Sequence, residues 1–540
     1  MARVRQTGVS LRGAFRGSIA LWLGVSGLFA APSHAAPSGA ASSAGRAVGA
    51  SSGEVGASSA VTLSDRILSE GLTSLGRGRI FSKGYETFIY ATPDKTKHQI
   101  GYVRVGHSVR LRPDADGQVR PQRGPACAGG YYPVMPRGFV CLDRSATLSP
   151  EGRYTSAMSG LVPSTEPLPY GYALSNGTPM YRRLPTRAEW EREERHLGAP
   201  GTHGPLSWGN KGHEVLAVKE LPQVTGELPW FLDAGGAAGS AAPLGLVRRS
   251  IPLGSMLAYS RVFEHEGRRF LLSADGTVVP ADRTRPFREV SFEGVELGGE
   301  RSLPLGWFRQ EGAARYRVSG SAGALEATRD GGFPRLGHVR LDPSASAEPI
   351  GGRRLLRTLE RAPSGEPWWV DEAEVTRVDR REKLPWGITG ADKWIWISLT
   401  RGTLVAYEGE RPVFATLQSP GVGGVPVRGR DPVKHSTTPM GIYRVTYKHR
   451  AATMSPEFGE DRSFWIADVP YTQYFDAPFA IHVAYWHDRF GQGMSAGCVN
   501  VSPRDGKRLF EFTAPHVPED WNGALAGAAN GRGTFIVIER

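Results

Sequence analysis

Short runs that alternate apolar and polar residues recur along most of this chain and predict a protein built mainly of β-strands. In the first folded part, the runs are separated by glycines, as expected for short strands joined by tight turns. They lie at 87–90, 100–105, 108–111, 130–134 and 137–141. The pattern predicts a small β-barrel over residues 78–145.

Residues 146–390 continue the strand-rich pattern with one predicted helix. Thr186 and Glu189 have the spacing of a capping box, which predicts a charged helix running to Arg195. Strands are predicted at 255–263, 268–273 and 277–279, with Asp275-Gly276 as a turn. Residues 367–370 and 374–378 are expected to pair. The region is expected to hold one or two further barrels, with its aromatic side chains used for core packing or for a ligand.

The last part of the chain, residues 391–540, predicts a separate β-rich domain. Its one clear helix spans 503–512, with Ser502 as the candidate cap. The predicted strands lie at 394–399, 403–407, 412–417, 442–447, 463–467, 480–484 and 534–538.

The N-terminus has the pattern of a secretory signal peptide. Four arginines precede an apolar run at 19–31, and small residues at 33–35 fit a cleavage site after Ala35. The run is short for an uncleaved membrane anchor, which is the alternative. Residues 36–62 are nearly all Ala, Gly, Ser and Val, which predicts a flexible tether. We therefore expect an exported protein, in the periplasm or cell envelope, with residues 1–35 removed.

The composition and net charge of the chain give little information about its binding partners. The 540 residues carry a net charge of +12, which suits an anionic partner. No zinc-type Cys/His spacing and no basic helix occurs, so we expect neither nucleic acid binding nor a metal, and no cofactor. No segment after the signal peptide is apolar enough to predict a stable membrane span.

The chain has three cysteines, and export would place them in an oxidising compartment, where disulfides form. Cys127 and Cys141 lie close together in one small module, so an oxidising compartment predicts a disulfide between them. Cys498 is then the odd thiol. Catalysis is the simplest reason to keep it.

A histidine and a cysteine near the C-terminus form the candidate active site. His482 lies in the apolar run 481–487, and Cys498 follows a glycine in the segment 495–500. An adjacent imidazole is a common way to activate a thiol as a nucleophile. The alternative is a core histidine and a buried thiol with no chemical role.

These residues resemble the L,D-transpeptidase (YkuD) catalytic domain family. His482, Ser495, Gly497, Cys498 and Asn500 fit its motif, but Ala496 replaces the usual histidine. The segment 438–443, Thr-Pro-Met-Gly-Ile-Tyr, resembles the family's hairpin, so the likeness covers roughly the last 150 residues. Residues 78–145 are similar to bacterial SH3-like domains, which either bind cell-wall material or are purely structural. The resemblance implies a YkuD-like catalytic domain at 391–540, preceded by SH3-like barrels.

The resemblance also implies a reaction on peptidoglycan stem peptides. Cys498 attacks the L-centre carbonyl of the diamino acid at stem position three, and D-Ala leaves. An amine from a second stem resolves the thioester; resolution by water would make an L,D-carboxypeptidase.

Roles for the site residues follow from the same resemblance. His482 is the base, held by the backbone carbonyl of Val483, and the N–H groups of Gly497 and Cys498 form an oxyanion hole. From the residues themselves, we expect Ser495 and Asn500 to brace the loop. Tyr485 and His487 are possible substrate contacts, and the alternative for His487 is that it caps a loop beside Asp488. Because Ala496 replaces the usual histidine, the alternative is a catalytically silent protein that binds peptidoglycan without turning it over.

Overall fold

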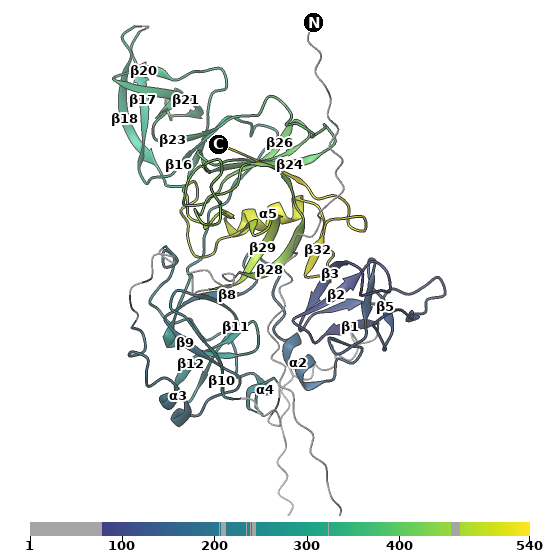
Figure 1. Ribbon diagram of the computed structural model, residues 1–540. Helices are drawn as coiled ribbons and strands as arrows, with labels where there is room; N and C mark the ends of the chain where they lie inside the picture. The colour runs from purple at the N-terminus through teal and green to yellow at the C-terminus, as the bar shows by residue number, and fades with distance from the viewer. Residues whose placement is uncertain are drawn as a thin grey trace, which may run out of the picture. The chain divides into compact units, whose positions relative to one another are not determined.

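The computed structural model describes residues 78–540, except 203, 205, 207–211, 234, 238, 240–244, 322 and 455–464. The predicted signal peptide and tether, residues 1–62, lie outside the described residues. The described chain is mainly β, as the sequence pattern predicts (Figure 1). None of the helices in this part of the chain is long and apolar enough to cross a membrane.

The N-terminal module folds as two small sheets around an apolar core. β1 pairs with β4 and β7, and β2 pairs with β3 and β6. Alternate residues of β2 are buried, because successive side chains of a strand point to opposite faces. The strands are β1 (Arg79–Ser82), β2 (Glu86–Tyr90), β3 (Gln99–Arg104), β4 (Ser108–Arg110), β5 (Tyr131–Pro133), β6 (Phe139–Cys141) and β7 (Ala146–Thr147).

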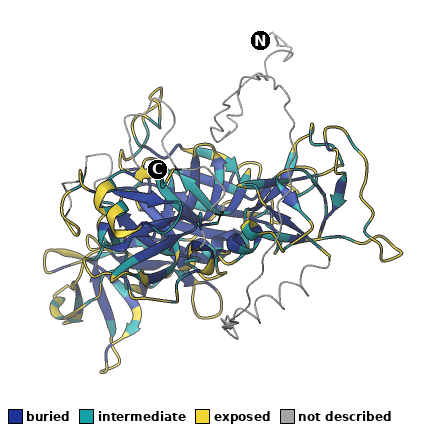
Figure 2. Cartoon of the chain, turned by 90° about the horizontal axis from the view of Figure 1, so that it is seen from below, coloured by how far each residue is buried: buried dark blue, intermediate teal, exposed yellow. Residues whose placement is uncertain are grey.

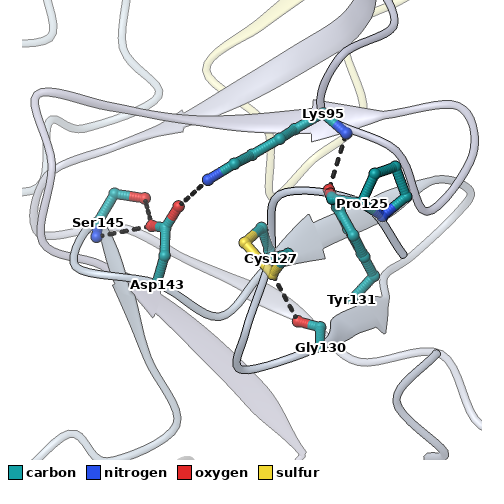
Figure 3. The surroundings of a disulfide bond; sticks show 8 residues. Lys95, Pro125, Cys127, Gly130, Tyr131, Asp143 and Ser145 are labelled. Carbon is teal, nitrogen blue, oxygen red and sulfur yellow. Dashed lines mark hydrogen bonds and ion pairs between the residues drawn. A yellow bond between two sulfur atoms is a disulfide. The ribbon is translucent and has the colours of Figure 1, made fainter. Parts of the chain in front are cut away.

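A disulfide joins Cys127 and Cys141 in this module (Figure 3). Beside it, the Tyr131 hydroxyl donates a 2.6 Å hydrogen bond to the carbonyl of Pro125 and accepts one of 2.8 Å from the Lys95 N–H. The Lys95 ammonium pairs with Asp143 at 3.0 Å. The disulfide therefore fastens the long β4–β5 connection to β6.

The second module contains the predicted hairpins, and β11, β12 and β13 pair in sequence order. Thr186 and Glu189 form the predicted capping box at the start of α3. Its elements are α2 (Arg153–Ser159), β8 (Gly171–Ser175), β9 (Thr178–Tyr181), α3 (Arg187–Glu193), α4 (Trp230–Asp233), β10 (Val247–Ile251), β11 (Met256–His265), β12 (Arg268–Ser273), β13 (Val278–Pro280), the 3₁₀-helix η2 (Ala281–Arg283) and β14 (Thr284–Pro286).

The third module corrects one prediction. β22 pairs with β17 and β21, whereas β23 pairs with β16 in another sheet, so the expected pairing of 367–370 with 374–378 is wrong. The turn at 372–374 leads the chain from one sheet into the other, so that Val370 and Val375 share a core with Phe308 while Val378 packs with Trp307. The strands are β16 (Leu305–Phe308), β17 (Ala313–Ser319), β18 (Glu326–Phe333), β19 (His338–Arg340), β20 (Glu348–Ile350), β21 (Arg353–Arg361), β22 (Pro367–Asp371) and β23 (Val375–Val378). The likeness of the modules to SH3 domains stays a prediction.

The C-terminal domain encloses one core between two sheets. One sheet has the order β15-β26-β25-β24-β33-β27, and the other contains β32-β28-β29-β30-β31. Ile397, Ile481 and Leu509 meet in the core between the two sheets and α5. The elements are β15 (Val295–Glu296), β24 (Lys393–Ser398), β25 (Thr403–Glu408), β26 (Arg411–Leu417), β27 (Gly441–Arg444), β28 (Tyr447–Met454), β29 (Ile466–Asp476), β30 (Phe479–Val483), β31 (Val499–Val501), α5 (Pro503–Phe512), β32 (Gly523–Leu525) and β33 (Phe535–Glu539).

In this domain the predicted helix bounds agree with the structure, and one predicted strand does not. Helix α5 has the predicted bounds, and the Ser502 hydroxyl accepts a hydrogen bond from the Asp505 N–H at 3.3 Å. The predicted strand at 463–467 was placed too early, because β29 runs from Ile466 to Asp476 and residues 463–464 lie outside the described residues. At the other end of α5, the buried Lys448 ammonium donates to the Thr513 carbonyl at 2.8 Å, which satisfies a helix-terminal acceptor.

The N-terminal module and the C-terminal domain share a sheet and a core. β3 pairs with β32 through Tyr102 and Gly523, and Trp521 is fully buried among the apolar residues of the N-terminal module. The Trp521 indole N–H also donates to the Met135 carbonyl at 2.9 Å. The buried residues, dark blue in Figure 2, lie mainly in strands such as these, while exposed residues lie mainly in loops.

We expect Trp521→Ala to destabilise the protein by about 3–5 kcal/mol, because it removes a fully buried indole from a core. Trp386→Ala is the matched control. Its side chain is 89% exposed, so the free energy of unfolding should change by less than about 0.5 kcal/mol. Denaturant unfolding of the three proteins checks this, and equal effects of the two substitutions would contradict it.

We also expect unfolded, unreduced protein to contain one titratable thiol, because Cys127 and Cys141 are bonded. The bonded cysteines are 14 residues apart, and a loop of that length is worth about 3 kcal/mol in the chain-entropy model. Cys127→Ser/Cys141→Ser should therefore lower the free energy of unfolding by about that amount. A count of three thiols would rule out the bridge.

Candidate active site

Two parallel strands bring the candidate catalytic residues together. β30 pairs with β31 in the register Ile481 with Val499 and His482 with Asn500. Paired residues in a sheet point to the same face, so the His482 and Asn500 side chains are neighbours. Cys498 immediately precedes β31, two residues from Asn500, and follows the same alternation. The pairing thus carries the thiol to the face that holds the imidazole.

The turn before Cys498 is held by Ser495. The Ser495 hydroxyl donates to the Cys498 carbonyl at 2.5 Å and accepts from the Gly497 N–H at 3.0 Å. The Ser495 carbonyl accepts in turn from the Val422 N–H at 2.8 Å. Ser495 therefore braces the nucleophile loop, the role expected from the sequence.

The Gly497 N–H donates to the Ser495 hydroxyl, and its part in an oxyanion hole stays a prediction. Its φ of +131° favours glycine, and a Cβ would come within 2.5 Å of the Phe479 ring. Packing against Phe479 is therefore sufficient to explain the glycine.

His482, Asn500 and His487 form a buried chain of hydrogen bonds. His482 Nδ1 donates to the Val483 carbonyl at 2.9 Å, so Nε2 is the acceptor, and it accepts from the Asn500 amide at 3.1 Å. The Asn500 oxygen accepts from His487 Nε2 at 3.1 Å, and His487 Nδ1 accepts from the Arg489 N–H at 3.3 Å. Because carbonyls only accept, this chain fixes the tautomers of both rings.

Burial determines the charge of the two histidines. It lowers the pKa of His482 to about 4, against the opposing effect of the bond to Val483. It also lowers the pKa of His487 to about 4. Both rings are therefore neutral at neutral pH, and His482 is able to accept a proton.

Cys498 itself is half-buried, with Sγ 3.8 Å from the Pro478 carbonyl oxygen. Ala496, the departure from the family motif, is exposed. The described residues contain no group of three side chains suited to a metal ion.

Two predicted substrate contacts lie elsewhere. Tyr485 is buried, stacks on Tyr172 of the second module at 3.9 Å, and donates to the Ala467 carbonyl at 2.9 Å. It packs the modules together, so the prediction of a substrate contact is wrong. His487 is fully buried against Asn500, so it positions Asn500 and does not meet a substrate.

Other modules hold the loop between the histidine and the cysteine. Asp488 pairs with Arg288 and Arg335, each at 3.0 Å, and the His213 ring lies edge-on to Trp486 at 6.2 Å. The sequence analysis missed these residues. They come from far along the chain, and no local motif marks them.

A model of the L,D-transpeptidase (YkuD) catalytic domain matches residues 392–538, which include His482 and Cys498. The comparison with curated proteins gives no match.

Solved structures with similarity to the chain include an L,D-transpeptidase from Xylanimonas cellulosilytica, at 22% identity and a TM-score of 0.20, covering 29% of this chain and 65% of that one. One from Stackebrandtia nassauensis has 22% identity and a TM-score of 0.18, covering 28% and 56%. One from Mycobacterium smegmatis has 14% identity and a TM-score of 0.21, covering 37% and 97%. The chain thus spans less than two thirds of the first two proteins. By the family match, residues 392–538 belong to the YkuD family of L,D-transpeptidase catalytic domains.

Proposed function

We propose that this protein is an exported L,D-transpeptidase that cross-links or remodels peptidoglycan stem peptides through a thioester on Cys498. The observation that carries the proposal is the placement of His482. Its imidazole is neutral, oriented by Val483 and Asn500, and lies on the face of the sheet to which Cys498 belongs.

The first half-reaction transfers the acyl group to Cys498. The thiol proton moves to His482 Nε2 as Sγ bonds to the carbonyl carbon of the donor peptide. Nε2 accepts a hydrogen bond from Asn500, so the imidazole exchanges this contact for the thiol as the proton moves. The C–N bond to D-Ala then breaks, and the proton passes from His482 to the departing amine.

The second half-reaction releases the acyl group. An amine of another stem attacks the thioester, the C–S bond breaks, and the proton lost by the amine returns to Sγ through His482. Attack by water in place of the amine gives an L,D-carboxypeptidase. The amine outcome is our proposal, because the matched family is one of transpeptidases.

The low pKa of His482 selects between two ways of activating the thiol. A preformed thiolate–imidazolium pair needs a charged ring, which burial disfavours here. General-base catalysis needs a neutral ring in the resting enzyme. We therefore propose that deprotonation of Cys498 accompanies its attack on the carbonyl.

Export and wall binding belong to the same proposal. Residues 1–35 act as the signal peptide, residues 36–62 as the tether, and the β-modules before the catalytic domain hold the enzyme at the wall. A disulfide between Cys127 and Cys141 is the kind of bond that persists in an oxidising compartment.

One observation favours a second candidate function. Ala496 stands where the family usually has a histidine, which leaves a catalytically silent peptidoglycan-binding protein as the alternative. Loss of a group that stabilises the transition state typically costs about 10²–10³-fold in rate. The nucleophile and base are both present, so a slow enzyme is the better supported function.

The nucleophile is tested by covalent labelling. Imipenem, which is bound in one of the similar solved structures, should add its mass at Cys498. Cys498→Ser should abolish the adduct and the turnover of disaccharide-tetrapeptide. Intact mass, peptide mapping and product analysis provide the readout. If the wild type is not acylated while Ala496→His gains acylation, the silent wall-binding protein is the correct reading.

The pH dependence tests the base. Neutral His482 is the active form, and its pKa is about 4, so the acylation rate should stay level as the pH falls from 7 to 5. It should decline about tenfold per unit only below the pKa of His482. Rapid-quench acylation measured with a fold check by circular dichroism gives the profile. An acid limb near pH 6.5, the ordinary histidine value, would contradict the expected lowering of the His482 pKa by burial.

A further inference from the structure

The loop that connects the base to the nucleophile is docked onto the third module. We call this segment, residues 484–494, the joining loop. Its Phe490 is buried in an apolar core that includes Leu305 and Trp307 of β16. The Phe490 ring also stacks on Phe292, with 5.4 Å between the ring centres. A buried aromatic ring supplies much of the apolar area in such a contact, so the third module helps to place the backbone of the joining loop.

Arg335 of the third module fastens the joining loop through Asp488. The Arg335 guanidinium donates to Asp488 Oδ1 at 3.0 Å and to Oδ2 at 3.3 Å, and it also donates to the Asp488 backbone carbonyl. The Asp488 side chain is only 15% exposed, and the Arg335 side chain 30%. Charge-assisted bonds from one guanidinium to both carboxylate oxygens fix an orientation as well as a distance. Arg335 therefore holds both the side chain and the backbone of Asp488.

A second arginine of the third module contacts the joining loop further along. Arg309 Nη1 donates to the Gly491 carbonyl at 2.9 Å, and a Cβ on Gly491 would come within 2.7 Å of the Arg309 side chain. The φ of Gly491 is +89°, in the left-handed region that favours glycine. The joining loop is therefore bonded to the third module at Asp488 and at Gly491, on both sides of the buried Phe490 ring.

The segment held in this way carries the hydrogen-bond chain of the base. His487 directly precedes Asp488, and its Nδ1 accepts from the Arg489 N–H at 3.3 Å, so the backbone around Asp488 orients the His487 ring. His487 Nε2 donates to the Asn500 oxygen at 3.1 Å, and the Asn500 amide donates to His482 Nε2 at 3.1 Å. A side-chain amide that accepts at its oxygen and donates from its nitrogen has one orientation that satisfies both contacts. A shift of Asp488 would therefore reach His482 through His487 and Asn500.

We propose that Arg335 is a positioning residue for the base, and that the third module thereby activates the catalytic domain of the same chain. Arg335 holds Asp488, and this contact keeps the His487 ring against Asn500. In the resting enzyme, Asn500 in turn orients His482. A misplacement of about 1 Å at a reacting group can lower a rate by about 100-fold. Docking of the third module therefore sets the rate of the chemical step.

A second arginine on the same carboxylate provides the matched control. Arg288 donates to Asp488 Oδ2 at 3.0 Å, but its side chain is 56% exposed. Exposed ion pairs contribute little, because solvent screens them and two long side chains must be ordered to form them. Arg335 holds the backbone carbonyl of Asp488 as well. Removal of Arg288 should therefore leave the joining loop in place, whereas removal of Arg335 should not.

This inference rests on the proposed function, and the experiment separates the two. Acylation of Cys498 in the full chain by disaccharide-tetrapeptide and by imipenem is followed by intact mass over a range of concentrations. The rate constant at saturation is thus obtained separately from the half-saturating concentration. Circular dichroism of each variant reports whether the fold is kept.

Arg335→Ala should lower the saturating acylation rate roughly 10- to 100-fold and change the half-saturating concentration by less than about threefold. Arg335→Lys should have an intermediate rate, because an ammonium keeps the charge but not the paired geometry of a guanidinium. Arg335→Lys also carries the test if Arg335→Ala does not fold. Arg288→Ala should keep the wild-type rate within about twofold.

NMR of protein with isotope-labelled histidine reports on the hydrogen-bond chain itself. The His487 Nε2–H is buried and bonded to Asn500, so it should exchange slowly with water in the wild type. Arg335→Ala should speed this exchange, and Arg288→Ala should not. His487→Gln identifies the signal by its loss.

Two outcomes overturn the inference alone. One is a saturating acylation rate that Arg335→Ala and Arg335→Lys both leave at the wild-type value. The other is an equal loss of rate in the Arg335 variants and Arg288→Ala, with unchanged exchange at His487. Acylation of the folded wild type by neither reagent overturns the proposed function itself, and the inference with it.

Discussion

The parallel pairing of β30 with β31 is the contact on which the chemistry depends. It sets His482 against Asn500 in register and delivers Cys498 to the same face from a separate loop. A slip of one residue would turn His482 to the opposite face of the sheet. The register is protected because Ile481, Val499 and Val501 are buried in the core between the sheets. Apolar packing thus fixes the register of the two strands, and the hydrogen bonds of His482 with Val483 and Asn500 then orient the imidazole.

The modules around the site share sheets and ion pairs with the catalytic domain. β3 and β11 add to the sheet of the catalytic domain, and Arg104 pairs with Asp468 across the first of these boundaries. A buried ion pair contributes little net stability, but loss of one partner leaves an isolated charge and costs several kcal/mol. Such a pair therefore penalises incorrect docking of the modules.

Local patterns predicted what local physics determines. The capping box at Thr186, the bounds of α5 with its Ser502 cap and the hairpins of the second module all came from residues a few positions apart. The motif around His482 and Cys498 was also readable, because the spacing of its residues is a property of one short segment.

What the sequence did not reveal depends on distant partners. Gly497 was assigned to the oxyanion hole, and the constraint that the ring of Phe479 places on it, from a neighbouring strand, was missed. Tyr485 was expected at a substrate and instead stacks on Tyr172 of another module. β22 and β23 pair with strands of different sheets, β22 with β17 and β21 and β23 with β16, and no short pattern distinguishes these partners. Each error concerns which surface a side chain faces, and that depends on how the modules dock.

The placement of Trp521 bears on the order in which the protein can mature. The core of the N-terminal module contains this indole, and the Arg104 N–H bonds to Asn522 across 418 positions of sequence. Contacts of such long range form late, because a large loop must close before they give any stability. If the chain crosses a membrane with its N-terminus first, this module waits with an incomplete core until nearly the last residues arrive. During that interval its apolar surface is open to proteases and to aggregation.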